Sequence, residues 1–423
     1  MSRWRWILKR AARRLWLRAS LIGALGVGAA ILAAVADRYI PWTIPASLSR
    51  RIGADAVDGV LNVIASSMLA VTTFSLSVMT TAYGAAASSV TPRATKLLIE
   101  DQVTQNVLST FVGSFLFSIV GLVVLQTGAY GDRGRVILFF VTIGVIGLIV
   151  VSLLRWIDYL TRFGRVGETT RRVEEAALAA IRDRIEHPFL GGTPASGPAP
   201  AAAAPVFGET IGYVQHIDMT ALSDCCAAFD AEVYVEALPG AFVHSGAPLA
   251  RVAGTRDEDA LKRALGEVAA AFAVGDERSF DQDPRFGLIV LSEIAQRALS
   301  PAVNDPGTAI DVIGRAVRLL SLWADGERPA PEAAPCARVH VPALALDDLF
   351  DDAFMAIGRD GAAMIEVQSR LLKSLFALAR QGDPRTRAAA LRQARLAHAR
   401  AEAALTLPQD RRRLNEIVQD AAP

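Results

Sequence analysis

The sequence predicts a mainly α-helical protein, with a four-helix transmembrane domain followed by a cytoplasmic α+β domain. The α+β domain is expected to hold a small strand-rich module and a helical C-terminal part. Three observations carry this prediction. Hydrophobic residues make up 52% of the 423 residues and the mean hydropathy is +0.32, which is too apolar for an ordinary water-soluble protein. The apolar excess lies in the first 155 residues, in long uncharged runs. After Arg155 the charges return in helical rhythm, which is typical of amphipathic helices.

Four uncharged stretches are each long enough to cross about 30 Å of hydrocarbon. They predict spans at about 19–36, 59–84, 107–127 and 136–154, within a transmembrane domain of residues 1–155. Basic residues precede the first stretch, as in a signal peptide, but no convincing small-residue cleavage site follows it, so a retained helix is favoured. Basic residues are concentrated before the first span, between the second and third, and after the fourth. Both termini are therefore expected in the cytoplasm.

The second predicted span differs from the others because small and hydroxyl side chains recur along it at roughly helical spacing: Ser66, Thr73, Ser77, Thr80 and Gly84. One interpretation is close helix packing, since such residues let helices approach and hydrogen-bond. The other is the wall of a pore in a homo-oligomer. No Asp, Glu, Lys or Arg lies inside any of the four predicted spans, which argues against a proton-coupled transporter.

The part after the spans divides by composition. Residues 156–190 predict a connecting amphipathic helix, and the Gly/Ala/Pro-rich residues 191–205 predict a linker. Residues 206–256 predict a small strand-rich cytoplasmic module, with strands near 212–217, 231–236 and 249–252 and a helix capped by Asp218 or Thr220. Residues 257–423 predict a helical cytoplasmic domain, with helices at about 257–274, 284–298, 306–324, 346–358, 361–380 and 384–405, and a loop at 326–341 that ends in a short strand.

Several functional classes are disfavoured by simple counts. The net charge of +1 gives no case for nucleic-acid binding. The three cysteines, Cys225, Cys226 and Cys336, are odd in number and two are adjacent, which favours buried thiols in a reducing compartment over a disulfide framework. The five histidines have no zinc-like spacing with each other or with a cysteine. Neither a metal nor another cofactor is expected.

A resemblance to a known family rests on two stretches. These are "GDERSFDQDPRFGLIVLSEIAQRALSPAVNDPGTAIDVIGRAVRLL" and the preceding "GYVQHID…PGAFVHSGAPL", which follow the four predicted spans. Together they look like the uncharacterised bacterial predicted-membrane-protein family catalogued as domain of unknown function 2254. The resemblance covers nearly the whole chain, and its "RALSPAVNDPGTA" core is quite specific. It implies a multi-pass protein of the bacterial inner membrane, and it brings no established activity and no functional residue.

Residues 276–313 hold the densest run of distinctive side chains. Asp283-Pro284 and Asn304 or Asp305 with Pro306 predict two capped helix starts, and Ser300-Pro301 predicts a helix end. Capping does not account for five further residues, which form either a structural ion-pair network or an anion pocket beside two helix N-termini. They are Arg278, Asp281, Gln282, Arg285 and Arg297, with Asn304 and Asp305 adjoining. Catalysis is disfavoured because no nucleophile lies near a histidine and no carboxylates cluster for a metal, so an enzyme is not expected.

Two functional hypotheses follow. The first is an oligomeric, channel-like conduit lined by the second span and assembled or gated by the cytoplasmic domain. The alternative is a membrane-anchored sensor or scaffold, whose cytoplasmic domain binds a small anion or a protein partner near Arg285, Arg297 and Asn304. The expected partners are the lipid bilayer and further copies of the chain.

Overall fold

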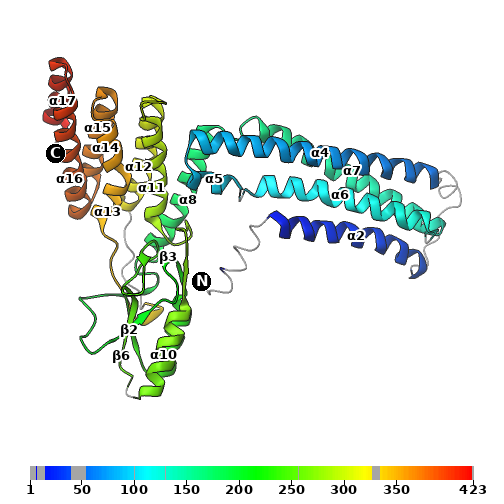
Figure 1. Cartoon of the computed structure of the whole chain (residues 1–423), viewed down its shortest axis with the longest axis horizontal. Coiled ribbons are helices and arrows are strands. Elements are labelled where there is room, and N and C mark those ends of the chain that lie inside the picture. The colour runs from blue at the N-terminus through cyan, green and yellow to red at the C-terminus, as the bar shows by residue number, and fades with distance from the viewer. Residues whose placement is uncertain are drawn as a thin grey trace. The chain divides into compact units, whose positions relative to one another are not determined.

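The computed structural model describes residue 6 and residues 15–39, 54–99, 101–128, 130–255, 257–325 and 334–421 (Figure 1). The chain divides into two units. The apolar helical unit consists of Ile7–Ser88 and Thr95–Glu168. The α+β unit consists of Met1–Trp6, Ser89–Ala94 and Thr169–Pro423. Most described residues are helical, as expected, and all eight described strands come after residue 190.

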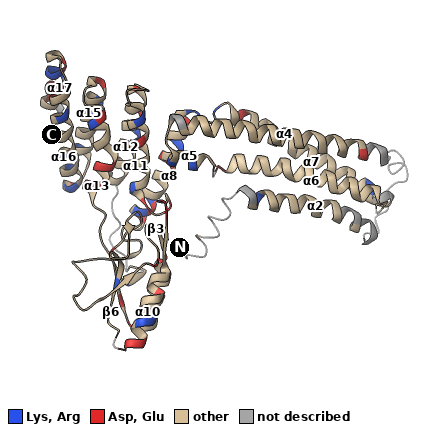
Figure 2. Ribbon diagram, in the orientation of Figure 1, with Lys and Arg blue, Asp and Glu red and all other residues tan. Residues whose placement is uncertain are grey.

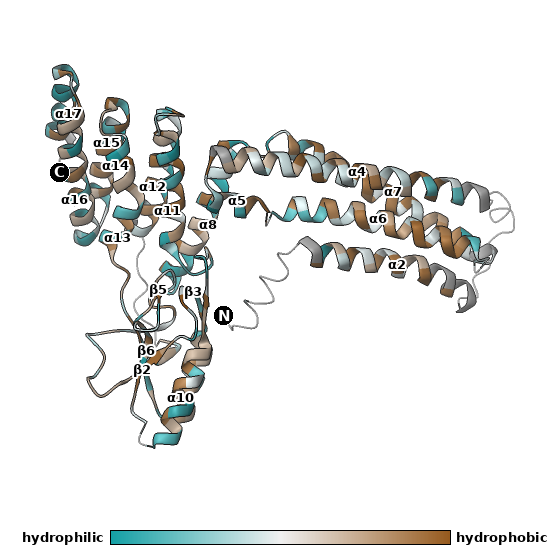
Figure 3. Ribbon diagram, in the orientation of Figure 1, coloured by the Kyte–Doolittle hydropathy of each residue, from teal (hydrophilic) through white to brown (hydrophobic). Residues whose placement is uncertain are grey.

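The apolar helical unit holds three helical segments that are long and apolar enough to cross a membrane: Val57–Ala87, Gln102–Gln126 and Gly134–Leu160. They lie in α4 (Ala54–Ser89), α6 (Gln102–Gln126) and α7 (Asp132–Leu160), and α5 (Pro92–Ile99) is the short helix between the first two. Figure 3 shows hydrophobic residues along all three, and Figure 2 shows few charges there. The first predicted span falls in α2 (Leu15–Tyr39), whose described apolar run, Leu17–Leu32, is shorter than a span requires. A fourth crossing therefore stays a prediction.

Glycines allow α2 and α6 to pack at close range. A Cβ atom on Gly26 would lie 2.8 Å from the carbonyl oxygen of Gly113, and one on Gly113 would lie 2.7 Å from Cγ2 of Ile22. Real Cβ atoms do not approach so closely, so these positions exclude a side chain. The hydroxyl of Tyr130 donates a hydrogen bond of 2.6 Å to the carbonyl oxygen of Ala30, which joins the α6–α7 connection to α2. Small residues thus serve helix packing on α6.

Two sheets form the strand-rich part of the α+β unit. The larger has the order β1-β8-β4-β6-β2, with β1–β8 and β8–β4 parallel and the other pairs antiparallel. The smaller, β5-β3-β7, is antiparallel. Helices α9 and α10 pack against the larger sheet, and the three cysteines are buried in the core. The bounds are β1 (Gly192–Pro194), β2 (Ala204–Phe207), β3 (Gly212–Ile217), α9 (Met219–Phe229), β4 (Glu232–Val235), β5 (Phe242–Val243), β6 (Pro248–Ala253), α10 (Glu258–Ala271), β7 (Phe272–Gly275) and β8 (Cys336–Val341).

The structure corrects two assignments made from the sequence. Residues 191–205, predicted as a linker, contain β1 and the start of β2. Both are edge strands, where the missing amide protons of Pro194 and Pro205 do not interrupt a ladder on both sides. The helix predicted to reach residue 274 ends at Ala271, because Phe272–Gly275 pairs with β3. Tertiary pairing outweighs local helix propensity there.

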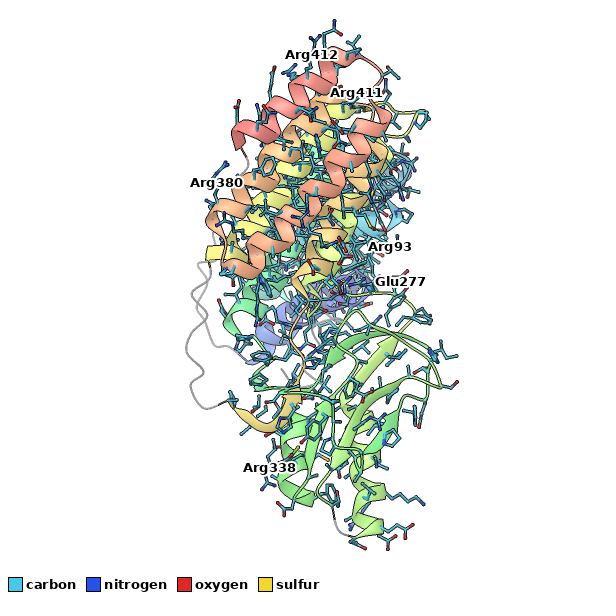
Figure 4. The ribbon with its side chains drawn as sticks, turned by 90° about the vertical axis from the view of Figure 1, so that its left-hand side faces the viewer. Arg93, Glu277, Arg338, Arg380, Arg411 and Arg412 are labelled. Carbon is cyan, nitrogen blue, oxygen red and sulfur yellow. The ribbon has the colours of Figure 1, made fainter. Side chains whose placement is uncertain are left out.

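Helices make up the rest of the α+β unit. Most predicted starts are confirmed, and Asp218 caps α9 by accepting from the amide of Ala221 at 3.1 Å. The predicted helix 346–358 contains a π-helical turn, and α17 was not predicted. Glu277, labelled in Figure 4, lies where the strands meet these helices. The bounds are α8 (Val166–Glu186), α11 (Pro284–Ala298), α12 (Pro306–Asp325), α13 (Leu346–Phe350), η1 (Asp351–Met355), α14 (Ala356–Asp360), α15 (Ile365–Gln381), α16 (Pro384–Ala404) and α17 (Pro408–Ala421).

Candidate functional site

The distinctive residues of 276–306 fall into two groups at opposite ends of α11. Arg278, Asp281, Gln282 and Arg285 lie at its N-terminal end, and Arg297 lies in its last turn. Twelve residues of helix separate Arg285 from Arg297, which corresponds to ~18 Å. The predicted pocket residues are therefore not brought to one place.

Arg278 and Asp283 form a buried ion pair at the start of α11. Nε and Nη2 of Arg278 both lie 2.7 Å from Oδ2 of Asp283, whose residue is 1% exposed. The other carboxylate oxygen of Asp283 accepts from the amides of Arg285 and Phe286 at 3.1 and 3.3 Å, so one side chain both caps the helix and neutralises the arginine. Burial raises the pKa of Asp283, and the charge of Arg278 opposes that rise. Gly240 (φ +93°) approaches this pair closely, since a Cβ there would lie 2.2 Å from Oδ2 of Asp283.

Gln282 and Asp281 attach the same segment to β3. Oε1 of Gln282 accepts from the amide of Ile217 at 2.9 Å, and its Nε2 donates to the carbonyl oxygen of Ile217 at 3.4 Å. This amide side chain thus completes the hydrogen bonding at the strand end. Oδ2 of Asp281 accepts from the indole of Trp6 at 2.9 Å, and the Trp6 ring stacks on His216 with centroids 5.3 Å apart. Gln282 and Asp281 therefore have structural roles, since they bind β3 and Trp6.

Arg285 joins α11 to the helix that contains the π turn. Its Nε and Nη2 donate to the two carboxylate oxygens of Asp352 at 2.6 and 3.2 Å, and its Nη1 donates to Asp348. Burial raises the pKa of Asp352, while Arg285 acts in the opposite direction. A forked guanidinium that binds two carboxylates in this way has few donors left for a ligand.

The second group forms the α11–α12 turn. Asn304 adopts a left-handed conformation (φ 49°), which asparagine tolerates better than most residues. Asp305 caps α12, because its carboxylate accepts from the amide of Thr308 at 3.0 Å and from the Thr308 hydroxyl at 2.6 Å. These hydrogen bonds lower the pKa of Asp305. Arg297 is exposed to solvent.

The geometry of 276–306 favours an ion-pair and capping network. Four of the five residues that capping left unexplained are bound within the protein, and an anion pocket at these positions stays a prediction. Among the residues that the structure describes, no three His, Cys, Asp or Glu side chains are grouped to hold a metal ion.

The predicted pore residues of the second span all lie on the outside of α4. Ser66, Thr73, Ser77, Thr80 and Gly84 are exposed in the single chain, and a Cβ on Gly84 would meet no atom within 4 Å. Three of the hydroxyls donate to carbonyl oxygens one turn earlier: Ser66 to Asn62, Thr73 to Leu69 and Thr80 to Leu76, each at 2.9 Å. Their oxygen lone pairs remain as acceptors on an otherwise apolar helix.

Sequence reasoning overlooked a second polar series, on α6. Thr104, Ser109, Ser114 and Ser118 are buried inside the apolar helical unit. The hydroxyls of Ser109 and Ser118 have no hydrogen-bond partner among the residues that the structure describes. These hydroxyl residues were visible in the sequence, but their spacing of five, five and four residues places them on no single helix face, so no pattern marked them.

The family model described as predicted membrane protein (DUF2254) matches residues 12–377, which include the three apolar helices, both sheets and the 276–306 network. The chain belongs to the DUF2254 family. The resemblance inferred from the "RALSPAVNDPGTA" core is thereby confirmed, and the family description assigns the protein to a membrane.

Curated relatives of this DUF2254 protein include an uncharacterized protein of Mycobacterium bovis and one of Mycobacterium tuberculosis. Each is 27% identical over 282 residues, covering 64% of this chain and 53% of the relative. The chain thus spans about half the length of the curated relatives it matches. No solved structure matches it.

Proposed function

We propose that this DUF2254 protein is an oligomeric, channel-like conduit of the bacterial inner membrane, in which the outer face of α4 lines the path. On this proposal the chain crosses the membrane several times, its termini are cytoplasmic, and the α+β unit assembles or gates the oligomer. The chain acts without catalysis.

The observation that carries the proposal is the exposed stripe of Ser66, Thr73, Ser77, Thr80 and Gly84 on a helix apolar enough to span. Hydroxyl groups that face lipid chains gain little, because hydrocarbon offers them no hydrogen bonds. The same groups lining a water-filled path can hydrogen-bond to its water. Because three of them donate their protons to their own helix, they would present acceptor oxygens to the path. Such a lining favours water and cations over anions.

Substituted-cysteine labelling tests the proposal directly. Thr73→Cys and Phe74→Cys place thiols at adjacent, exposed positions about 100° apart around the helix. The three native cysteines are buried and give a low background. A charged thiosulfonate reagent reacts in water but not in hydrocarbon, so we expect Thr73→Cys in a reconstituted membrane to be labelled and Phe74→Cys to be protected.

Two further measurements complete the test. The purified protein in planar bilayers should pass current, and Ser77→Leu should change its conductance while Phe74→Leu should not. The mass in lipid nanodiscs should correspond to several subunits. Equal labelling of the two thiols, a monomeric mass, or no current from an assembled oligomer would each contradict the conduit.

The alternative is a membrane-anchored sensor or scaffold. For this alternative the binding site would lie away from Arg285, because that guanidinium is bound by Asp348 and Asp352. A cavity elsewhere in the α+β unit favours a ligand site of this kind.

A further inference from the structure

The α+β unit contains a cavity of about 390 Å³, a volume within the range of small-molecule sites. Its wall comes from the end of α8 and the turn after it, from α12, from residues 343–347 and from the first turns of α16. Aromatic and aliphatic side chains, including Phe189 and Trp323, form most of this wall. None of the predicted site residues lines it.

Arg184 is the unusual member of the wall. It is 2% exposed, and its Nη2 donates to the carbonyl oxygen of Gln282 at 3.2 Å. Its Nη1 is buried and has no partner among the residues that the structure describes. Burial lowers the pKa of Arg184 to about 10, although the charges of Asp283 and Asp183 act in the opposite direction. A buried guanidinium with an unpaired nitrogen is costly unless an anion completes it.

A second residue of the wall also holds a buried donor without an acceptor among the described residues. The indole nitrogen of Trp323 is buried and unpartnered among the described residues. Arg385 lies at the exposed side of the wall, and its guanidinium forms no ion pair with any described residue. The carboxylate of the wall, Asp347, is already paired with Arg392 at 3.0 Å. The cavity therefore combines apolar walls with a positive balance of charge from Arg184 and Arg385, and two residues of its wall hold buried, unpartnered nitrogens.

We propose that this cavity binds a small organic anion, in which a carboxylate or phosphate is attached to an apolar body. Arg385 binds the charged group directly, and the buried positive charge of Arg184 attracts it from within the wall. The apolar body packs against Phe189 and Trp323. Because Arg184 also holds the backbone of Gln282, an occupied cavity reinforces the attachment of the 276–283 segment to β3. The proposal is independent of the conduit, and each can fail without the other.

Calorimetric titration of the full chain in phosphatidylcholine nanodiscs tests the site. The probe is 1-naphthylacetate, with 1-naphthylacetamide as its neutral counterpart, inorganic phosphate as an anion without an apolar body, and empty nanodiscs as the control for lipid partitioning. We expect saturable binding of the naphthylacetate and at least about tenfold weaker binding of the other two probes. Hydrogen exchange at residues 276–283 should slow when the naphthylacetate is bound.

Three variants locate the binding. Arg385→Ala removes an exposed charge and should weaken binding by about tenfold, whereas its matched control Arg387→Ala, also exposed on α16, should not. Ala388→Phe fills the cavity from an exposed position and should abolish binding without disturbing the buried core. The proposal is overturned if the neutral amide or phosphate binds as tightly as the naphthylacetate, if Ala388→Phe leaves binding unchanged, or if no probe binds saturably up to about 1 mM.

Discussion

The buried carboxylate of Asp283 allows a quantitative comparison between two helix caps of the same type. Asp283-Pro284 opens α11 and Asp305-Pro306 opens α12, so both pair an aspartate cap with a proline in the first turn. They differ in environment, because Asp283 is buried against Arg278 whereas Asp305 is exposed. Replacing each with alanine separates the contribution of the cap from that of the ion pair.

The expected magnitudes follow from the contacts. Losing either cap costs about 1 kcal/mol. Asp283→Ala also leaves Arg278 unpaired, and breaking a buried pair costs about 3–5 kcal/mol. Arg278 is 17% exposed, and burial already penalises the charge of Asp283, so the lower part of that range applies. We therefore expect about 4 kcal/mol for Asp283→Ala, about 1 from the cap and about 3 from the ion pair. We expect about 1–2 kcal/mol for Asp283→Asn, which retains a capping oxygen, and about 1 kcal/mol for Asp305→Ala.

Hydrogen exchange of the full chain, read by mass spectrometry, reports the opening free energy of each helix separately. Protection of the α11 amides should fall about 900-fold in Asp283→Ala, while protection of α12 should fall only about fivefold in Asp305→Ala. If Asp283→Ala costs α11 no more than Asp305→Ala costs α12, the ion pair adds nothing to the cap and the reasoning fails.

Three further outcomes are expected. Gly113→Leu drives a side chain into Ile22 on α2, so the apolar helical unit should lose thermal stability in detergent by about 1–3 kcal/mol, and an unchanged melting temperature would contradict this helix contact. Burial raises the pKa of Glu174, but its hydrogen bonds and charge interactions with Arg318 and Arg315 outweigh this and lower it. A carboxyl whose pKa is lower in the folded state stabilises the protein above its unfolded pKa of 4.5, and this stabilisation is lost as the pH falls through the folded pKa. Glu174→Gln should therefore cost about 1.5–3 kcal/mol of unfolding free energy at pH 7 in denaturant titrations, and much less in acid. A cost that does not change with pH would refute this prediction. Burial raises the pKa of two of the cysteines, Cys225 and Cys226, to about 11, so iodoacetamide should alkylate them at least about 100-fold more slowly in the folded chain than in urea, and rapid labelling of the native chain would disprove their burial.

Local structure was predictable from the sequence where the residue types themselves determine it. The Asp-Pro steps marked the starts of α11 and α12, and the uncharged runs marked three apolar helices. Long-range pairing was not predictable in the same way. A Pro-rich stretch became two edge strands because β8 and β6 lie beside them, and an alanine-rich helix gave way to β7 because β3 supplies the hydrogen bonds.

For the candidate site, too, the local residues were predictable and their long-range partners were not. The distinctive letters of 276–306 were visible in the sequence, but their partners lie in distant segments, such as Ile217, Asp348 and Asp352. The cavity at Arg184 was not predicted, because its wall comes from four separated segments that hold ordinary residues. Composition records which charges exist, whereas only the fold shows which of them remain without a partner.

The position of β8 sets an order of events during synthesis. This strand lies between β1 and β4, yet the ribosome produces it about 100 residues after β4, once α11 and α12 have been made. Until residues 336–341 emerge, β1 has no neighbour in the sheet and β4 has a bare edge. A chain that stops before Cys336 would expose strand edges of the kind that promote aggregation. The strand-rich part is therefore completed only after α11 and α12 have been made, and it cannot be excised as residues 206–256 alone.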